Sequence, residues 1–225
     1  MRRLRPRWVV AGVLALLALA LIVNELRPVG GVPARQTIGS SASAPGDATP
    51  VPWPNGAQAA FGGRENGVLA SSPDARPRPI ASVAKVMTAL VVLQEKPLEE
   101  NEDGPAITIT PDDVTEFQQE AANKESVLPV AAGEQLTERQ ALQGLLIPSG
   151  NNVAALLARW ASGSMDAHVQ RMNARARELG MGHTTFADVS GLSEKTVSVP
   201  ADLVRMGQAA LDQPVLANIV QQAQA

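Results

Sequence analysis

An uninterrupted apolar run near the start of the chain constrains its fold more than any other feature. Residues 8–23 read WVVAGVLALLALALIV, and four of the seven residues before them are arginines. A basic start followed by an apolar segment is typical of an export signal or a signal-anchor. We therefore expect residues 1–26 to be a membrane-anchoring helix or a signal peptide. The rest of the chain is expected to lie outside the cytoplasmic membrane, tethered to it or secreted.

Residues 27–56 differ in composition from the segments on both sides. They are rich in Pro, Gly, Ser and Ala and show hardly any apolar periodicity. Such a segment cannot bury enough apolar surface to offset the entropy lost on ordering. We interpret it as a flexible linker, so the globular domain is expected to occupy residues 57–225.

The composition excludes several classes of site. The 225-residue chain has no cysteine, which excludes thiol catalysis, disulfides and cysteine-ligated zinc. Its two histidines, His168 and His183, offer few candidates for a metal site or a Ser-His-Asp triad. Acidic residues number 22 against 19 basic ones, and four of the basic ones lie in the first seven positions. The acidic body of the chain argues against nucleic-acid binding.

Strand patterns come first in the predicted domain, and helical patterns dominate its middle. The Asn66-Gly67 pair between two strand-like segments predicts a hairpin, and residues 107–110 predict a short strand. The order of the elements favours an α+β fold. Capping residues and apolar residues at helical spacing predict helices that begin near Ala81, after Thr137, after Asn151, after Ser164 and at Pro200.

Two of these helices carry more specific predictions. In the helix after Ser164, His168 is expected on the polar side. The helix that begins near Ala81 is expected to have a single apolar stripe. That stripe consists of Val83, Val86, Met87, Leu90 and Val91.

Ser82 and Lys85, in the sequence Ser-Val-Ala-Lys, form the first candidate catalytic pair. Residues three apart share one face of a helix, so the lysine Nζ is expected to approach the serine Oγ. A lysine whose pKa is lowered by burial can accept the serine proton and so create a nucleophile. The backbone N–H of Ser82, at the start of a helix, is expected to stabilise an oxyanion. Because Ser-x-x-Lys also arises by chance, the pair needs support from a second motif.

Ser149-Gly150-Asn151 is that second motif. It follows Pro148, in a short connection between two predicted helices, where small residues let the backbone approach a ligand. A second hydroxyl there can relay a proton, and the Asn151 amide can hydrogen-bond both a substrate carbonyl and Lys85. The alternative is that Ser149 and Asn151 only cap the following helix.

The two motifs and their flanking residues resemble those of the D-alanyl-D-alanine carboxypeptidases, the low-molecular-weight penicillin-binding serine peptidases. Residues 79–89 (PIASVAKVMTA) resemble the nucleophile segment of that family. Residues 145–152 (LLIPSGNN) resemble its second motif in the Ser-Gly-Asn form, and residues 186–211 are similar to the stretch that follows. The resemblance covers roughly residues 57–220.

The resemblance implies a β-lactamase/transpeptidase-like fold, in which a helical part packs on an antiparallel sheet. It implies that Ser82 is the acylated nucleophile and Lys85 its general base. It also implies that Ser149 and Asn151 complete the proton relay, and that Gly150 and Asn151 contact the substrate. The implied substrate is a peptidoglycan stem peptide, whose terminal D-Ala leaves through an acyl-enzyme, with β-lactam antibiotics as inhibitors. No metal or organic cofactor is implied.

The third element of the family, a Lys-Thr-Gly motif on a strand, is not visible in the sequence. Lys195-Thr196 is followed by Val197, and the pair aligns better with the loop after Ser190-Gly191-Leu192. In the family fold, the strands that carry this motif share a sheet with the first hairpin and cover the nucleophile helix. We therefore expect a C-terminally incomplete catalytic domain, with part of that helix uncovered and little activity in this chain alone.

Two alternative functions stay open at the level of the sequence. A β-lactamase shares the Ser-x-x-Lys layout, but it usually has Asp where this chain has Gly150, and no segment clearly supplies the Glu that activates its deacylating water. A non-catalytic, membrane-tethered scaffold would explain the missing strand motif, although the intact serine, lysine and Ser-Gly-Asn motifs argue against it. Asp112 and Asp113 are interpreted as first-turn residues of a helix, and Asp188 and Asp202 as loop or capping residues.

Overall fold

The computed structural model describes residues 51–63, 66–73 and 75–222 of the chain. The predicted membrane or signal segment, residues 1–26, lies outside the described residues, as does the predicted linker up to residue 50. Within the described part, no helix is both long and apolar enough to cross a bilayer. The predictions for residues 1–26 therefore stay predictions.

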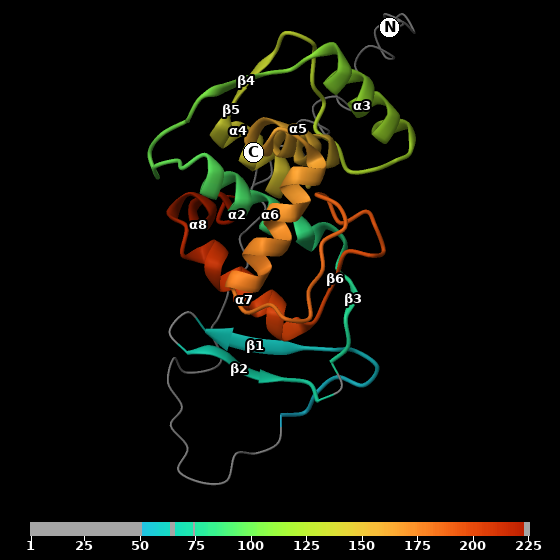
Figure 1. The fold of residues 1–225 in the computed structure, drawn as a ribbon, viewed down its shortest axis with the longest axis vertical. Coiled ribbons are helices and arrows are strands. Elements are labelled where there is room, and N and C mark those ends of the chain that lie inside the picture. The colour runs from blue at the N-terminus through green and yellow to red at the C-terminus, as the bar shows by residue number, and fades with distance from the viewer. Residues whose placement is uncertain (1–50, 64–65, 74, 223–225) are drawn as a thin grey trace, which may run out of the picture. The chain divides into compact units, whose positions relative to one another are not determined.

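The described part of the chain contains both short strands and longer helices (Figure 1). This mixture confirms the α+β prediction. The strands are β1 (Ala60–Gly63), β2 (Gly67–Ser71), β3 (Arg78–Pro79), β4 (Ala106–Thr108), β5 (Gln135–Thr137) and β6 (Val197–Ser198). After a 3-10 turn, η1 (Ala81–Val83), the helices are α2 (Ala84–Glu95), α3 (Pro111–Ala122), α4 (Glu138–Leu146), α5 (Asn151–Ser162), α6 (Met165–Glu178), α7 (Pro200–Leu211) and α8 (Pro214–Ile219).

The described strands form three antiparallel pairs: β1 with β2, β3 with β6, and β4 with β5. The β1–β2 pair places Gly63 opposite Gly67, which confirms the predicted hairpin. Helix α7 packs against both of its strands. Gly62 makes this close approach possible, because a Cβ atom there would lie 2.8 Å from the Val204 side chain of α7.

Helix α2 lies at the centre of the helical part and packs against α4, α5, α6 and α7 (Figure 1). The prediction of a single apolar stripe along it is wrong, because helices surround α2 and bury residues on every face. Val83, expected in the stripe, lies in η1 and is 44% exposed. The buried residues of α2 are Ala84, Lys85, Met87, Thr88, Ala89, Leu90, Val91, Val92 and Leu93.

Local capping signals set the helix boundaries where the sequence predicts them. Thr137 and Gln140 form a reciprocal capping box at the start of α4. The Ser164 hydroxyl accepts a hydrogen bond from the backbone N–H of Ala167 and caps α6. Helix α7 begins at Pro200, as predicted, and ends at Leu211.

His168 does not lie on a polar side of α6, as the sequence suggested, but is fully buried. Its helix packs on both α2 and α5, so the buried face of α6 is wider than a single stripe. The His168 Nδ1 atom lies 2.9 Å from the Ser162 hydroxyl. Burial lowers the pKa of His168 to about 4, so the imidazole is neutral at physiological pH.

Candidate active site

Ser82 and Lys85 lie together at the start of the central helix, as their spacing predicts. Ser82 is part of η1, and Lys85 follows in the first turn of α2. The Lys85 Nζ atom lies 3.0 Å from the Ser82 Oγ atom. Ser82 is exposed, whereas only 1% of Lys85 is exposed. A reagent in solution can therefore reach the hydroxyl, while the amine that contacts it is held in the protein interior.

A backbone carbonyl from a distant loop completes the environment of the lysine. The Lys85 Nζ atom donates a second hydrogen bond, of 3.2 Å, to the carbonyl oxygen of Ser190. One turn further along α2, the Thr88 hydroxyl donates to the carbonyl of Val189 at 2.7 Å. These two bonds hold residues 189–190 against the nucleophile helix and fix the direction of the Lys85 side chain.

The same loop also contacts the turn that carries Ser82. Gly191 has a φ of +83°, and a Cβ atom at this position would overlap the carbonyl oxygen of Ala81. Ala81 itself has a φ of +47°, which is uncommon for a residue with a side chain. Only glycine fits at position 191, and the contact fixes the backbone directly before the candidate nucleophile.

Asp188 organises this loop from within. Its Oδ2 atom accepts hydrogen bonds from the backbone N–H of Leu192 at 2.7 Å and of Ser193 at 3.3 Å. The same atom accepts a bond from the Ser190 hydroxyl at 3.1 Å, and the Thr196 hydroxyl donates to Oδ1. The predicted loop role of Asp188 is confirmed, and Thr196 belongs to this loop, as the sequence also suggested.

The electrostatic environment of Lys85 favours a neutral amine more than water does. Burial lowers the pKa of its ammonium group to about 8, while the charges of Asp188, Glu120 and Glu125 act in the opposite direction. A lysine with this pKa is partly neutral near physiological pH, whereas an ordinary lysine is almost fully protonated. Lys85 therefore has the property that a general base requires.

Asn151 does not make the contact with Lys85 that its sequence position suggested. It is the buried first residue of α5, and its Nδ2 atom donates to Glu125 Oε2 at 2.9 Å. The expected hydrogen bond to Lys85 is absent among the described residues. The adjacent Asn152 exchanges two hydrogen bonds of 2.9 Å with the backbone of Leu128. The two asparagines thus fasten the segment after α3 to the start of α5.

Ser149 and Gly150 form the tight connection before α5. Ser149 has a φ of +62°, and Gly150 is buried. A Cβ atom at Gly150 would lie 2.9 Å from the carbonyl oxygen of Gly144. In the described structure, the Ser149 hydroxyl makes no hydrogen bond with Ser82 or Lys85. The strained backbone at Ser149 is of the kind that recurs at functional sites.

A hollow of about 520 Å³ adjoins this site, bounded by α3, α5, α6 and the loop that contains Ser190. Ser190, whose carbonyl holds Lys85, and Asn151 both line it. Its acidic lining residues are Glu116, Glu120, Asp166 and Asp188. Glu120 belongs to no motif in the sequence, although its spacing of four residues from Glu116 places both on one face of α3.

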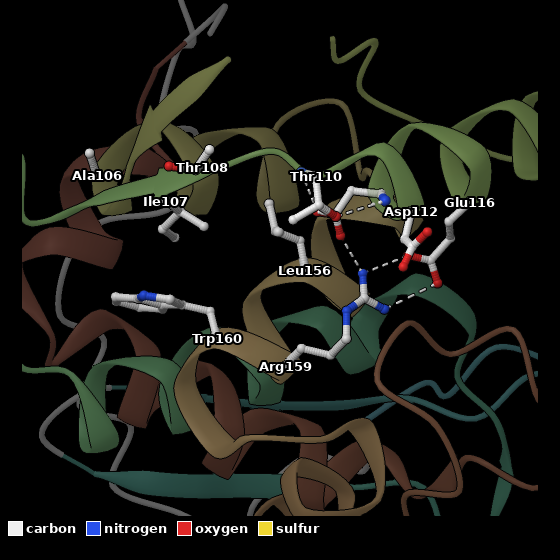
Figure 2. Close-up of a pocket in the computed structure, with 10 residues that line it drawn as sticks. Ala106, Ile107, Thr108, Thr110, Asp112, Glu116, Leu156, Arg159 and Trp160 are labelled. Atoms are coloured by element: carbon white, nitrogen blue, oxygen red, sulfur yellow. Dashed lines mark hydrogen bonds and ion pairs between the residues drawn. The ribbon is translucent and has the colours of Figure 1, made fainter. Parts of the chain in front are cut away.

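A larger hollow of about 670 Å³ lies between β4, α3 and α5 (Figure 2). The Arg159 side chain bridges its wall, with ion pairs of 2.7 Å to Asp113 and 2.8 Å to Glu116. Asp113 also closes the capping box at the start of α3, which confirms its first-turn role. Neither Ser82 nor Lys85 lines either of the two hollows. We associate the smaller one with the candidate catalytic pair because Ser190, whose carbonyl binds Lys85, lines it.

Comparison with known proteins identifies the family. A sequence profile described as D-alanyl-D-alanine carboxypeptidase matches residues 60–223. The chain belongs to this family. The match confirms the resemblance inferred from the motifs at residues 79–89 and 145–152.

Individual members of the family are similar over much of the described part. The chain is 37% identical over 155 residues to a D-alanyl-D-alanine carboxypeptidase of Mycobacterium tuberculosis, covering 68% of this chain and 49% of the relative. It is 36% identical over 141 residues to a D-alanyl-D-alanine endopeptidase of Pseudomonas aeruginosa, covering 62% of this chain and 42% of the relative. The chain thus spans about half the length of the curated relatives it matches.

The folds also agree. The crystal structure of a D-alanyl-D-alanine carboxypeptidase from Mycobacterium tuberculosis superimposes with a TM-score of 0.68 at 30% identity. The alignment covers 82% of this chain and 66% of that structure. This likeness confirms the predicted mixed helical and sheet fold of the penicillin-binding peptidases.

Proposed function

We propose that this member of the D-alanyl-D-alanine carboxypeptidase family is a serine peptidase that forms an acyl-enzyme on Ser82. The observation that carries the proposal is the 3.0 Å contact between the Ser82 hydroxyl and the buried Lys85 amine. The substrate is a peptidoglycan stem peptide that ends in D-Ala-D-Ala. The names of the relatives support this substrate class.

In the proposed reaction, the neutral Lys85 amine accepts the proton of the Ser82 hydroxyl as the serine oxygen attacks the carbonyl of the penultimate D-Ala. The resulting oxyanion is stabilised by the backbone N–H of Ser82 at the start of the nucleophile helix. The Lys85 ammonium then returns the proton to the leaving D-Ala amine. Water hydrolyses the ester and restores Ser82. Lys85 serves as acid and base in turn because its pKa is lowered to about 8.

The Ser-Gly-Asn turn supplies the remaining proposed contacts. Ser149 relays the proton to the leaving group after a change of rotamer, and the backbone at Gly150 approaches the substrate. Asn151 positions a substrate amide through the oxygen of its side chain, since its Nδ2 atom already binds Glu125. No metal or organic cofactor takes part in this proposal.

We propose that the domain acts outside the cytoplasmic membrane. The basic and apolar residues 1–26 serve as a membrane tether or a cleaved signal, and residues 27–56 link them to the peptidase domain. Peptidoglycan lies in that compartment. β-Lactam antibiotics, which acylate serine peptidases of this kind, are the proposed inhibitors.

Labelling with a fluorescent penicillin tests the acyl-enzyme proposal directly. Covalent label on the peptide that contains Ser82, found by mass spectrometry and lost in Ser82→Ala, is the expected result. Long incubation allows even a slow acylation to be detected. No label on Ser82 under these conditions contradicts the proposal.

Substrate assays distinguish the types of peptidase. Release of free D-Ala from a linear pentapeptide indicates carboxypeptidase activity, and cleavage of a cross-linked dimer indicates endopeptidase activity; relatives with both names match this chain. We expect D-Ala release. Rapid turnover of ampicillin without D-Ala release would favour the β-lactamase alternative instead.

A further inference from the structure

Four acidic side chains line the smaller hollow, and they differ in whether their carboxylate oxygens already have an ion-pair or hydrogen-bond partner. Glu116 forms an ion pair with Arg159 at 2.8 Å. The Asp188 carboxylate accepts the hydrogen bonds that hold its own loop. Asp166, at the start of α6, is exposed to solvent. Each of these three carboxylates is therefore satisfied by the protein or by water.

Glu120, near the end of α3, is different. Among the described residues that line the hollow, it alone has a buried carboxylate oxygen, Oε2, without a hydrogen-bond partner. A buried carboxylate oxygen without a partner is costly, and the Oε2 atom of Glu120 can accept a hydrogen bond from a molecule in the hollow. The hollow that it lines also contains Asn151 and Ser190.

The charges around Glu120 adjust its affinity for a proton. Burial raises the pKa of its carboxyl group to about 7, and the nearby charges of Glu116 and Glu125 raise it too. The backbone N–H of Asn152 and the charge of Lys85 act in the opposite direction. Glu120 thus joins Lys85 as a second group near this site that exchanges a proton close to neutral pH.

We propose that Glu120 is the base that activates water for the hydrolysis of the acyl-enzyme on Ser82. This inference rests on the proposed acyl-enzyme mechanism and adds a residue to its second half. The water oxygen bonds to the acyl carbonyl carbon while Glu120 takes one of the water protons. The bond between that carbon and Ser82 Oγ then breaks. The proton held by Glu120 returns to Ser82 Oγ through the Lys85 amine, which is hydrogen-bonded to that oxygen.

If Lys85 is the base for acylation and Glu120 the base for deacylation, Glu120→Gln should affect only the second step. The substitution keeps the size of the side chain but removes the proton acceptor. Acylation of Ser82 by a fluorescent penicillin is expected to keep its rate, because Lys85 serves that step. Loss of label from the acylated protein is expected to slow by about 10²-fold or more, the usual contribution of a general base.

The pH dependence of the same step provides a second readout. In the unmodified protein, the rate of deacylation is expected to rise with pH through about 7, as Glu120 loses its proton. Glu120→Gln removes this rise. The matched control is Glu116→Gln, one helical turn away in the same hollow. It should leave the deacylation rate at high pH unchanged and move the rise to lower pH, because it removes a neighbouring negative charge.

The outcomes separate this inference from the proposed function. A Glu120→Gln protein that acylates normally and deacylates slowly supports the inference, and normal acylation itself demonstrates that the variant folds. Equal rates of deacylation in the variant and the unmodified protein overturn it and leave the acyl-enzyme mechanism standing. If the variant cannot be labelled, the pH profile of the unmodified protein decides, and a deacylation rate that is flat near pH 7 overturns the inference. Failure of the unmodified protein to label at Ser82 overturns the proposed function.

Discussion

At the scale of single residues, the site depends on a difference in exposure between two neighbours. Ser82 is exposed in η1, whereas Lys85, three residues later, is buried in α2. Burial makes the ammonium form costly, and the hydrogen bonds to Ser82 and to the Ser190 carbonyl direct the nitrogen. The combination converts an ordinary lysine into a directed base. Neither feature would suffice without the other, because a buried amine that pointed elsewhere could not accept the serine proton.

Lys85→Arg tests this function of the lysine. The guanidinium keeps the positive charge but does not lose its proton in the accessible pH range, so it cannot serve as the base. We expect the rate of Ser82 acylation by a penicillin to fall by about 10²- to 10⁴-fold. In the unmodified protein the rate should rise with pH through about 8, as Lys85 loses its proton, and level off above that. Lys195→Arg, at an exposed loop position, is the control and should label normally.

His168 is a buried base that the proposed mechanism does not use, and its effect should appear in stability. Burial lowers the pKa of His168 to about 4, so the folded protein favours the neutral ring. The corresponding stability is complete above the ordinary histidine pKa of about 6.5 and is lost as pH falls through about 4. Urea unfolding should show a lower unfolding free energy at pH 4.5 than at pH 7, and this decrease should be smaller in His168→Gln. The exposed His183→Gln serves as control, and an equal loss in all three proteins would contradict the assignment.

At the scale of elements, the segment from Asp188 to Thr196 positions the site as much as the nucleophile helix does. It supplies the Ser190 carbonyl to Lys85 and the Val189 carbonyl to Thr88. It also places Gly191 against the turn before Ser82. A loop held at two points on α2 and at one point on η1 cannot shift without moving the base or the nucleophile.

Gly191→Ala is the most direct test of this arrangement. A methyl group at 191 would overlap the Ala81 carbonyl, and the φ of +83° is unfavourable for alanine. We expect a loss of roughly 1–3 kcal/mol in unfolding free energy and a marked fall in Ser82 labelling. Gly182→Ala, at a position with open space around it, is the control and should behave as the unmodified protein. Normal labelling of Gly191→Ala would indicate that the loop does not position Ser82.

The elements also indicate which parts of the site a sequence can predict. The first residues of α4, α6 and α7 depend on capping residues within a few positions of them, and the sequence predicts these starts correctly. The contact between Ser82 and Lys85 is equally local. The Ser190 carbonyl reaches Lys85 across 105 positions, and Glu125 reaches Asn151 across 26. Such partners depend on how the helices pack. Every residue has a backbone carbonyl, so the sequence does not indicate which of them will bind Lys85.

At the scale of the whole domain, the described residues bury several polar groups away from the candidate site, among them the carboxyl groups of Asp113, Glu138 and Asp202. Glu138, the first residue of α4, is fully buried, and neither of its carboxylate oxygens has a hydrogen-bond partner among the described residues. Gly104 lies against it, because a Cβ atom there would come within 2.8 Å of Glu138 Oε2. An uncompensated carboxylate in this position opposes folding once it is ionised.

The pH dependence of overall stability should therefore contain a contribution from Glu138. Burial raises the pKa of its carboxyl group to about 7, against an opposing influence of Lys96. Because the folded-state pKa is raised, the stability from this group is complete below the unfolded value of about 4.5 and is lost as pH rises through about 7. The side chain in Glu138→Gln cannot ionise. We therefore expect the unfolding free energy of the variant, relative to that of the unmodified protein, to be roughly 1–3 kcal/mol more favourable at pH 8 than at pH 5. Urea unfolding at the two pH values measures this, with the exposed Glu134→Gln as control. The assignment is wrong if the difference between Glu138→Gln and the unmodified protein is the same at both pH values.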